Sequence, residues 1–242
     1  MERFHYNFYP KSEIVDNFLS DEDIFYIEKL FRADSSLSIQ IEKYGKTMSG
    51  AGGNSLDTVR SHYWYPSFSK EKNSCYYQIN NFINSKIQAR YGTEIECENW
   101  HILNAFLPYH IHSDSYDKID HNATVLPENY DYAWTFLIPL SNYNTNTIVF
   151  NEVSNFSKNP DTWIDKTAAK KIDTITEIER NLYFSHINKD HIPYFSIDKI
   201  FPWKKGNLLS MSRHAFHCSD NFPTKNILEK RALIGWSYAR YK

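Results

Sequence analysis

The chain has 242 residues, enough to bury a hydrophobic core, and its 41% hydrophobic and 23% charged residues are usual for a globular protein. Its 27 lysines and arginines nearly balance 29 aspartates and glutamates, so the formal charge of −2 gives no electrostatic reason to expect nucleic acid or an anionic membrane as a partner. Three cysteines exclude a full disulfide framework, and no C-x-x-C pair suggests a structural zinc site.

The N-terminus is charged and aromatic and lacks the apolar segment of a secretory signal. No run approaches the roughly 18 apolar residues that a membrane-spanning helix needs. We therefore expect a cytoplasmic protein. No linker, low-complexity run or repeat divides the chain, so we expect one domain over residues 1–242.

Two helices are expected in the N-terminal part. Residues 18–33 carry an apolar stripe at helical spacing, and Ser20 can cap this helix together with Asp23. Residues 68–90 show a second amphipathic pattern, which Gly92 can end.

The segment between these helices has two further features. Three of the seven glycines lie at residues 50–53, which favours a mobile loop. Residues 58–66 follow as a short aromatic strand.

Strand patterns dominate the second half of the chain. In residues 100–107 the alternation places Trp100, Ile102, Asn104 and Phe106 on one side. Further strands are expected at residues 132–141, 145–153, 199–212 and 231–241. Two helices followed by a block of strands predict a mainly β fold, with the helices packed outside a rolled β core.

Residues of about 154–200 interrupt the strands as an insertion. Within it, Ile172, Ile175, Ile178 and Leu182 recur at helical spacing and predict a helix. The insertion fits two roles equally well, a lid over a substrate site or a buttress on the outside of the sheet.

A candidate metal site lies at the strand ends. His112 and Asp114 are two residues apart, so in an extended chain both side chains point to the same side. With His217 they supply two imidazoles and one carboxylate, the set that suits non-haem Fe(II) enzymes that activate oxygen. Because His217 lies far downstream, the fold must bring remote strand ends together, as the open mouth of a jelly-roll barrel does.

Neighbouring residues compete for two of these positions. His110 and His112 could form a two-histidine clamp of the cupin kind, and His214 competes with His217, of which we favour His217. We favour Asp114 as the carboxylate, because no glutamate follows at the spacing that a cupin clamp brings.

These residues resemble the Fe(II)/2-oxoglutarate-dependent oxygenase superfamily, and among its branches the prolyl-hydroxylase-like one. The resemblance covers roughly residues 12–241. It includes the segments IVDNFLSDEDIFYIEKLF, TFLIPLS, NTNTIVF, WKKGNLLSMSRHAFHCSDNF and KRALIGWSY. The family pattern is H-x-D, a distant histidine, and an arginine or lysine on the last core strand. His112, Asp114, His217 and Arg231 match it, and the implied fold is a double-stranded β-helix, or jelly-roll.

The resemblance also implies a chemistry. His112, Asp114 and His217 would hold Fe(II), and Arg231 would bind the distal carboxylate of 2-oxoglutarate, with Lys230 as an adjacent rival. Asn104 stands where relatives often carry a tyrosine that bonds this cosubstrate. The implied enzyme is a dioxygenase that uses molecular oxygen to hydroxylate a C–H bond of a small molecule or a peptidyl substrate. The carboxylate at position 114 favours hydroxylation, since halogenating relatives have a small residue there.

Three further residues, Arg60, Tyr109 and Arg213, are weaker candidates for contacts with substrate or cosubstrate. Two other functions fit the same ligands. One is a β-roll that binds a metal or small molecule as a sensor, and the other is a cupin-like metalloenzyme that uses His110, His112 and His217. Neither alternative needs a cation on the last strand.

Overall fold

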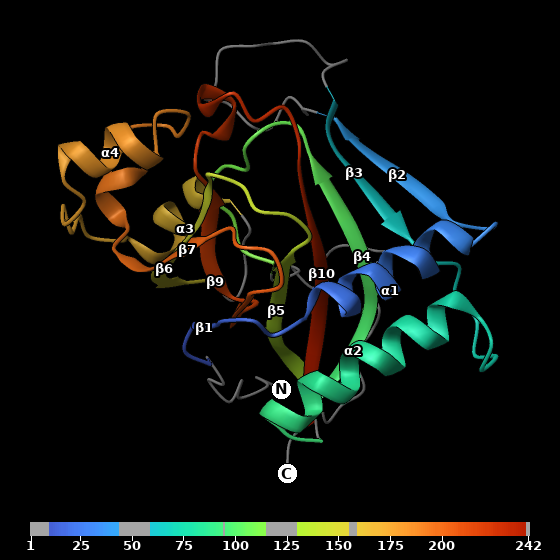
Figure 1. Ribbon diagram of the computed structural model, residues 1–242. Coiled ribbons are helices and arrows are strands. Elements are labelled where there is room, and N and C mark those ends of the chain that lie inside the picture. Colours follow the sequence, from blue (N-terminus) through green and yellow to red (C-terminus); the bar gives the residue numbers. More distant parts are fainter. Residues whose placement is uncertain (1–9, 44–58, 94, 115–129, 155–158, 241–242) are drawn as a thin grey trace.

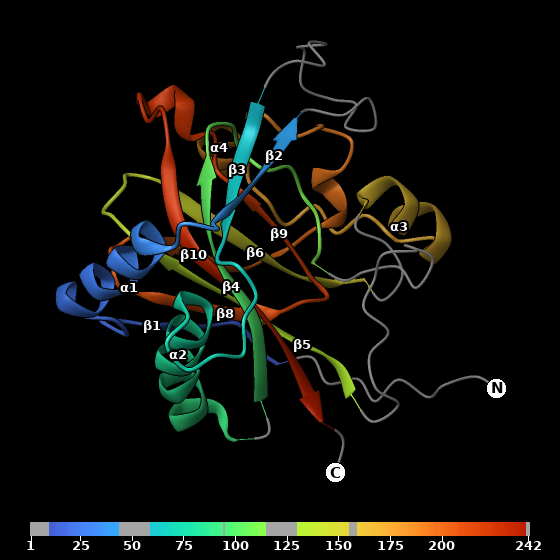
Figure 2. The same cartoon turned by 90° about the vertical axis from the view of Figure 1, so that its right-hand side faces the viewer.

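The computed structural model describes residues 10–43, 59–93, 95–114, 130–154 and 159–240. A large and a small antiparallel β-sheet enclose a common core, and helices α1 and α2 cover the other face of the large sheet (Figure 1). Helix α3 lies on the side of the small sheet, well away from α1 and α2 (Figure 2). The mainly β architecture with N-terminal helices outside agrees with the expectation from the sequence.

Both N-terminal helices form as expected. Helix α1 spans Asp21–Ala33, and its capping box is complete, because the Ser20 hydroxyl accepts the Asp23 N–H at 3.1 Å and the Asp23 carboxylate accepts the Ser20 N–H at 2.9 Å. Helix α2 spans Cys75–Tyr91 and ends at Gly92, whose φ of 106° lies in the region that glycine tolerates. It begins later than expected because Ser74 caps it.

The large sheet has the strand order β1-β8-β5-β10-β4-β3-β2. Its strands are β1 (Glu13–Val15), β2 (Ser38–Lys43), β3 (Val59–Tyr65), β4 (Ile95–Ala105), β5 (Tyr130–Pro139), β8 (Leu208–Ser212) and β10 (Lys230–Arg240). Strand β10 pairs with both β4 and β5, so it lies at the centre of the sheet and both of its faces are covered.

The small sheet has the order β7-β6-β9, with β6 at Asn146–Val153, β7 at Ile197–Pro202 and β9 at Ala215–Ser219. The single strand expected at residues 199–212 is therefore two strands in different sheets. Gly206, with a φ of 77°, lies in the turn between them, and an added Cβ there would meet the Leu19 carbonyl oxygen at 2.2 Å. The turn transfers the chain from the small sheet to the large one.

The insertion contains α3 (Pro160–Thr167), α4 (Glu177–Tyr183) and a short 3-10 helix at Ile192–Tyr194. The predicted apolar stripe is wrong, because Ile172, Ile178 and Leu182 are exposed, and Ile175 precedes the helix, which Thr176 caps. The insertion instead packs through Phe184, Ile187, Ile192 and Phe195 onto residues of β6 and β9. It buttresses the small sheet, as one of its two expected roles required.

The expected mobile loop and the expected lack of a membrane-spanning helix are the last two points of the fold. The glycines at residues 50–53 lie outside the described residues. Among the residues that the structure does describe, no helix combines the length and the apolar character needed to cross a membrane.

Candidate metal centre

His112, Asp114 and His217 meet at one point, although they come from distant parts of the chain. One ligand atom from each residue lies within 4.8 Å of the others. The centres of the two imidazole rings are 4.3 Å apart, and His217 Nε2 is 3.8 Å from Asp114 Oδ2. The structure therefore brings together the three residues that the sequence analysis singled out as metal ligands.

The backbone fixes this meeting point. His217 lies on β9. His112 follows β4 and pairs with His217 through an isolated antiparallel bridge. The His112 N–H donates to the His217 carbonyl at 3.0 Å, and the His217 N–H donates to the His112 carbonyl at 2.8 Å. Asp114, two residues beyond His112, faces the same ion position, as the spacing predicted.

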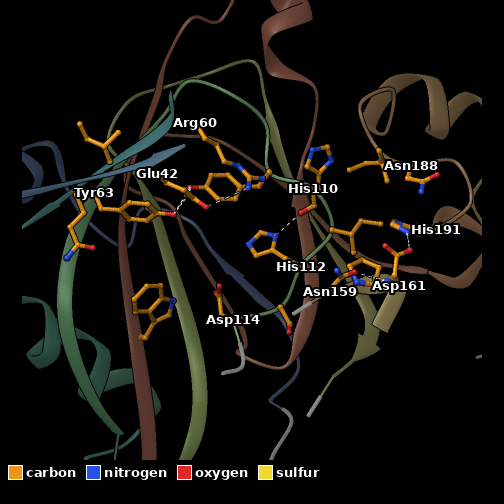
Figure 3. Close-up of a pocket in the computed structure, with 18 of the residues that line it drawn as sticks. Glu42, Arg60, Tyr63, His110, His112, Asp114, Asn159, Asp161, Asn188 and His191 are labelled. Atoms are coloured by element: carbon orange, nitrogen blue, oxygen red, sulfur yellow. Dashed lines mark hydrogen bonds and ion pairs between the residues drawn. The ribbon is translucent and has the colours of Figure 1, made fainter. Parts of the chain in front are cut away.

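Both imidazoles are oriented for metal binding. His112 Nδ1 lies 2.7 Å from the His110 carbonyl oxygen, and His217 Nδ1 lies 3.1 Å from the Ala215 carbonyl oxygen (Figure 3 draws the first of these bonds). A carbonyl oxygen only accepts, so each Nδ1 carries the proton and each Nε2 keeps its lone pair. This is the usual second bond of a metal-binding histidine.

The carboxylate is held equally well. The Thr135 hydroxyl on β5 donates to Asp114 Oδ2 at 2.6 Å, and Arg213 Nη2 donates to the Asp114 carbonyl oxygen at 3.2 Å. Thr135 is a site residue that the sequence analysis missed. Its position in an apolar strand could have indicated it, because a buried hydroxyl group needs a hydrogen-bond partner.

The electrostatic setting keeps the ligands in their metal-binding forms. Burial lowers the pKa of His112, and the neighbouring His217 lowers it further, so the imidazole is neutral near pH 7. Burial alone would raise the pKa of Asp114, but His217, His112 and the Thr135 hydrogen bond outweigh it and lower that pKa overall. The site therefore offers a neutral His112 imidazole and an ionised carboxylate, as metal binding requires.

Two cavities meet at these ligands. The inner cavity, of about 80 Å³, lies between the sheets and is lined by residues that include Thr147, Trp203, Met211 and Lys230. The outer cavity, of about 580 Å³, opens between β2, β3 and the insertion. His112, Asp114, Tyr63, Tyr109 and Trp236 line both cavities, so the candidate ligands stand at the junction between them.

Lys230 is the cation of the inner cavity. It is 2% exposed, its Nζ lies 4.0 Å from the Trp203 ring centre, and it makes no hydrogen bond to any described part of the chain. Burial lowers the pKa of Lys230 to about 7, although Asp220 opposes the shift. A buried ammonium without a hydrogen-bond partner is costly unless a ligand completes it.

Arg231 and Asn104 lie on the opposite face of the large sheet, which corrects their expected position. Arg231 Nε donates to Asn104 Oδ1 at 2.8 Å, and Arg231 Nη1 pairs with Glu28 of α1 at 3.1 Å. The alternation correctly placed Arg231, Leu233 and Gly235 on one side, but that side packs against the helices. Neither Arg231 nor Asn104 lines a cavity that contains the candidate ligands.

The competing histidines lie elsewhere. His110 lines the outer cavity and packs on His186, with ring centres 5.7 Å apart, while His214 Nδ1 bonds to the Ser154 carbonyl oxygen at 3.0 Å. Neither belongs to the group of potential ligands.

Among the weaker candidates, Arg60 and Tyr109 line the outer cavity. Arg213 stacks near Trp236 behind Asp114, with its guanidinium carbon 5.6 Å from the ring centre.

Known structures share this architecture, although no family model matches the chain and no curated protein matches its sequence. The epimerase SnoN of nogalamycin biosynthesis, solved with Fe3+, alpha ketoglutarate and nogalamycin RO, aligns with a TM-score of 0.51 at 11% identity, over 95% of this chain and 78% of SnoN. The non-haem alpha ketoglutarate dependent carbocyclase SnoK from nogalamycin biosynthesis aligns with a TM-score of 0.51 at 13% identity, over 95% and 79% of the two chains. This chain has their fold. The expected jelly-roll core, and the resemblance to Fe(II)/2-oxoglutarate oxygenases at the level of the fold, are thereby confirmed.

Within this jelly-roll, the Thr135 hydroxyl gives a direct test of the metal centre. Replacing it in Thr135→Val keeps the side-chain shape but removes the hydrogen bond to Asp114, and such changes around a metal site typically cost about 10- to 100-fold in affinity. We expect weaker binding of Co(II) or Ni(II) in calorimetric titration. Thr147→Val, on β6 and without a bond to a ligand, should leave the affinity unchanged, and equal affinities in both variants would contradict the assignment.

Proposed function

We propose that this protein is a non-haem Fe(II)- and 2-oxoglutarate-dependent oxidoreductase that oxidises a C–H bond of its substrate. The observation that carries the proposal is the pairing of two features in one cavity: a His-Asp-His ligand set and a buried lysine with no hydrogen-bond partner among the described residues. The fold shared with two alpha ketoglutarate dependent enzymes supports it.

The residues fit the metal and the cosubstrate. His112 Nε2, His217 Nε2 and an Asp114 oxygen would hold Fe(II), a set that leaves the opposite face of the ion open. Lys230 would bind the distal carboxylate of 2-oxoglutarate, taking the role that the sequence analysis gave to Arg231. An ammonium–carboxylate contact away from water offsets the cost of burying either charge alone.

Each part of the chain then has a defined task. Bound iron and 2-oxoglutarate would supply the oxidising power, with 2-oxoglutarate consumed together with molecular oxygen. The backbone bridge and Thr135 orient the ligands, while Trp203, Met211 and Ile234 exclude water from the inner cavity. The outer cavity would hold the carbon that is oxidised beside His112 and Asp114. Its volume of about 580 Å³ falls in the range of small-molecule sites.

Hydroxylation is the outcome that we propose for this chain. The retained carboxylate of Asp114 occupies the position that halogenation would need to leave open. SnoN and SnoK, which share the fold, are described as an epimerase and a carbocyclase, so the fold alone does not select hydroxylation.

The first test is cosubstrate turnover. With Fe(II) and ascorbate, the protein should convert 2-oxoglutarate to succinate, and Asp114→Ala should reduce the rate at least about 100-fold because it removes a metal ligand. Succinate is quantified by chromatography. Absence of both turnover and 2-oxoglutarate binding in the unaltered protein would favour the sensor reading.

The second test distinguishes the two adjacent cations. Lys230→Ala should weaken 2-oxoglutarate binding by about 10- to 100-fold, the usual worth of a charge-assisted hydrogen bond. Arg231→Ala should change this affinity by less than about twofold, while lowering the melting temperature because Glu28 loses the nearer of its two ion-pair partners. Calorimetry and thermal unfolding measure the two effects. A loss of affinity confined to Arg231→Ala would restore the original assignment.

The third test uses pH. Because the pKa of Lys230 is about 7 in the free protein, the side chain is mostly neutral above that pH, and binding a carboxylate must then take up a proton. We expect the 2-oxoglutarate dissociation constant to be flat below pH 7 and to rise above it, by up to about tenfold per unit. Lys230→Arg stays charged and should lack this rise. The same slope in both proteins would exclude Lys230 as its source.

A further inference from the structure

In the outer cavity the carboxylates are accessible to a ligand, whereas the guanidinium of Arg60 is buried. Apart from Asp114 of the metal centre, its described lining contains the carboxylates Glu42 and Asp161 and one lysine or arginine, Arg60. The side chains of Glu42 and Asp161 are 35% and 56% exposed, whereas that of Arg60 is 2% exposed. The charge available to a ligand in this cavity is therefore negative.

Glu42 is held in position by a built network rather than free in solvent. Its Oε2 lies within hydrogen-bond distance of the hydroxyls of Ser61 (2.8 Å), Tyr63 (2.9 Å) and Tyr109 (2.8 Å). Arg60 contacts its other oxygen at 3.7 Å, with its guanidinium 4.0 Å from the Tyr109 ring centre. The network aims the edge-strand carboxylate at the cavity, next to the tyrosines that border the metal centre (Figure 3).

Asp161 faces the same cavity from the insertion. It lies in the first turn of α3 and contacts His191, and Asn159 and Asn188 add amide groups to this wall. Figure 3 shows Asp161 and Glu42 on opposite sides of His112, on elements that are remote in the sequence. A ligand that spans the cavity thus meets a carboxylate at each end.

Aromatic faces complete the lining. Tyr63 and Tyr65 stack with ring centres 6.2 Å apart and an interplanar angle of 15°, and Trp236 lies at the junction with the inner cavity. Aromatic faces accept both the apolar face of a saturated ring and a nearby ammonium group.

We propose that the substrate is a hydroxyl-rich small molecule that carries an ammonium group, with Glu42 and Asp161 as the residues that select it. This inference rests on the proposed function for the reaction itself. One of the two carboxylates pairs with the ammonium, the other carboxylate and the amide groups of Asn159 and Asn188 bond hydroxyls, and the aromatic wall packs on the carbon skeleton. Phosphorylated or carboxylated substrates are disfavoured, because the guanidinium in the described lining is buried and already engaged by Glu42.

The test uses three matched sugars that differ at one carbon. Methyl β-cellobioside is used in three forms: with an amino group on its terminal sixth carbon, with the normal hydroxyl group there, and with that carbon oxidised to a carboxylate. Binding to the protein with Fe(II) and 2-oxoglutarate is measured anaerobically by calorimetry. We expect the amine to bind about two- to fivefold more tightly than the neutral sugar, a partly exposed ion pair's usual contribution, and the carboxylate to bind more weakly than both.

Two variants and one control assign the preference. One of the two variants Asp161→Asn and Glu42→Gln, the one at the carboxylate that pairs with the ammonium, should abolish the amine preference, and the other should keep it; the glutamine oxygen can still accept the tyrosine hydroxyls. Asp165→Asn removes a carboxylate from the same helix but outside the lining, and should keep the full preference.

Each outcome decides between the proposals. Equal affinity for the three sugars would overturn the inference, and so would a failure of the amine to bind. A preference for the amine that survives in both lining variants would overturn it as well. Cosubstrate binding is measured separately in each preparation. If 2-oxoglutarate does not bind but the preference for the amine is intact, the proposed oxidation is rejected and the proposed class of ligand is kept.

Discussion

The structure of the candidate site depends on two backbone hydrogen bonds between His112 and His217. These bonds connect strand β9 with the segment after β4, and so place the two imidazoles side by side without the help of a metal ion. Each histidine then bonds, through Nδ1, to the carbonyl two residues before it. The same short stretch of backbone therefore supplies a ligand, its position and its orientation. Side-chain packing has only to place the carboxylate, and Thr135 does this from β5.

The ligand set could be predicted from the sequence because its main constraint is local. A spacing of two in an extended chain puts His112 and Asp114 on one side whatever the rest of the fold does. The same holds for the α1 cap, where Ser20 and Asp23 lie three residues apart. The third ligand was less constrained, because alternation does not choose between His214 and His217 at a strand end; in the structure His214 bonds to the Ser154 carbonyl oxygen and His217 lies beside His112.

The cation could not be chosen in the same way. Alternation on β10 separates Lys230 from Arg231, but both faces of this central strand are buried, so hydrophobicity does not tell which face lines the barrel. The deciding contact is long-range, the ion pair of Arg231 with Glu28 on α1. One signal was present in the sequence: Gly235 shares the Arg231 face, and its missing side chain leaves room for Trp100, a residue of the helix-side core. The prediction for the insertion was wrong for a related reason, since of the regularly spaced apolar residues only Ile175 joins its core, which Phe184 and Ile187 complete.

Apart from Asp114, which lines both cavities, the described charges that a ligand can reach have opposite signs in the two cavities, and this division has a physical consequence under the proposed function. The inner cavity offers the ammonium of Lys230, and the outer cavity offers Glu42 and Asp161, with the candidate metal ligands between them. An anionic cosubstrate is attracted inward and repelled by the outer carboxylates, whereas an ammonium-bearing substrate is attracted to the outer wall and repelled by the inner lysine. Because Coulomb interactions strengthen where water is excluded, the discrimination is largest near the junction, where a wrongly placed ligand would block the metal. The insertion contributes to this arrangement through its packing: its core is fixed to the small sheet, and that anchoring holds Asp161 opposite Glu42.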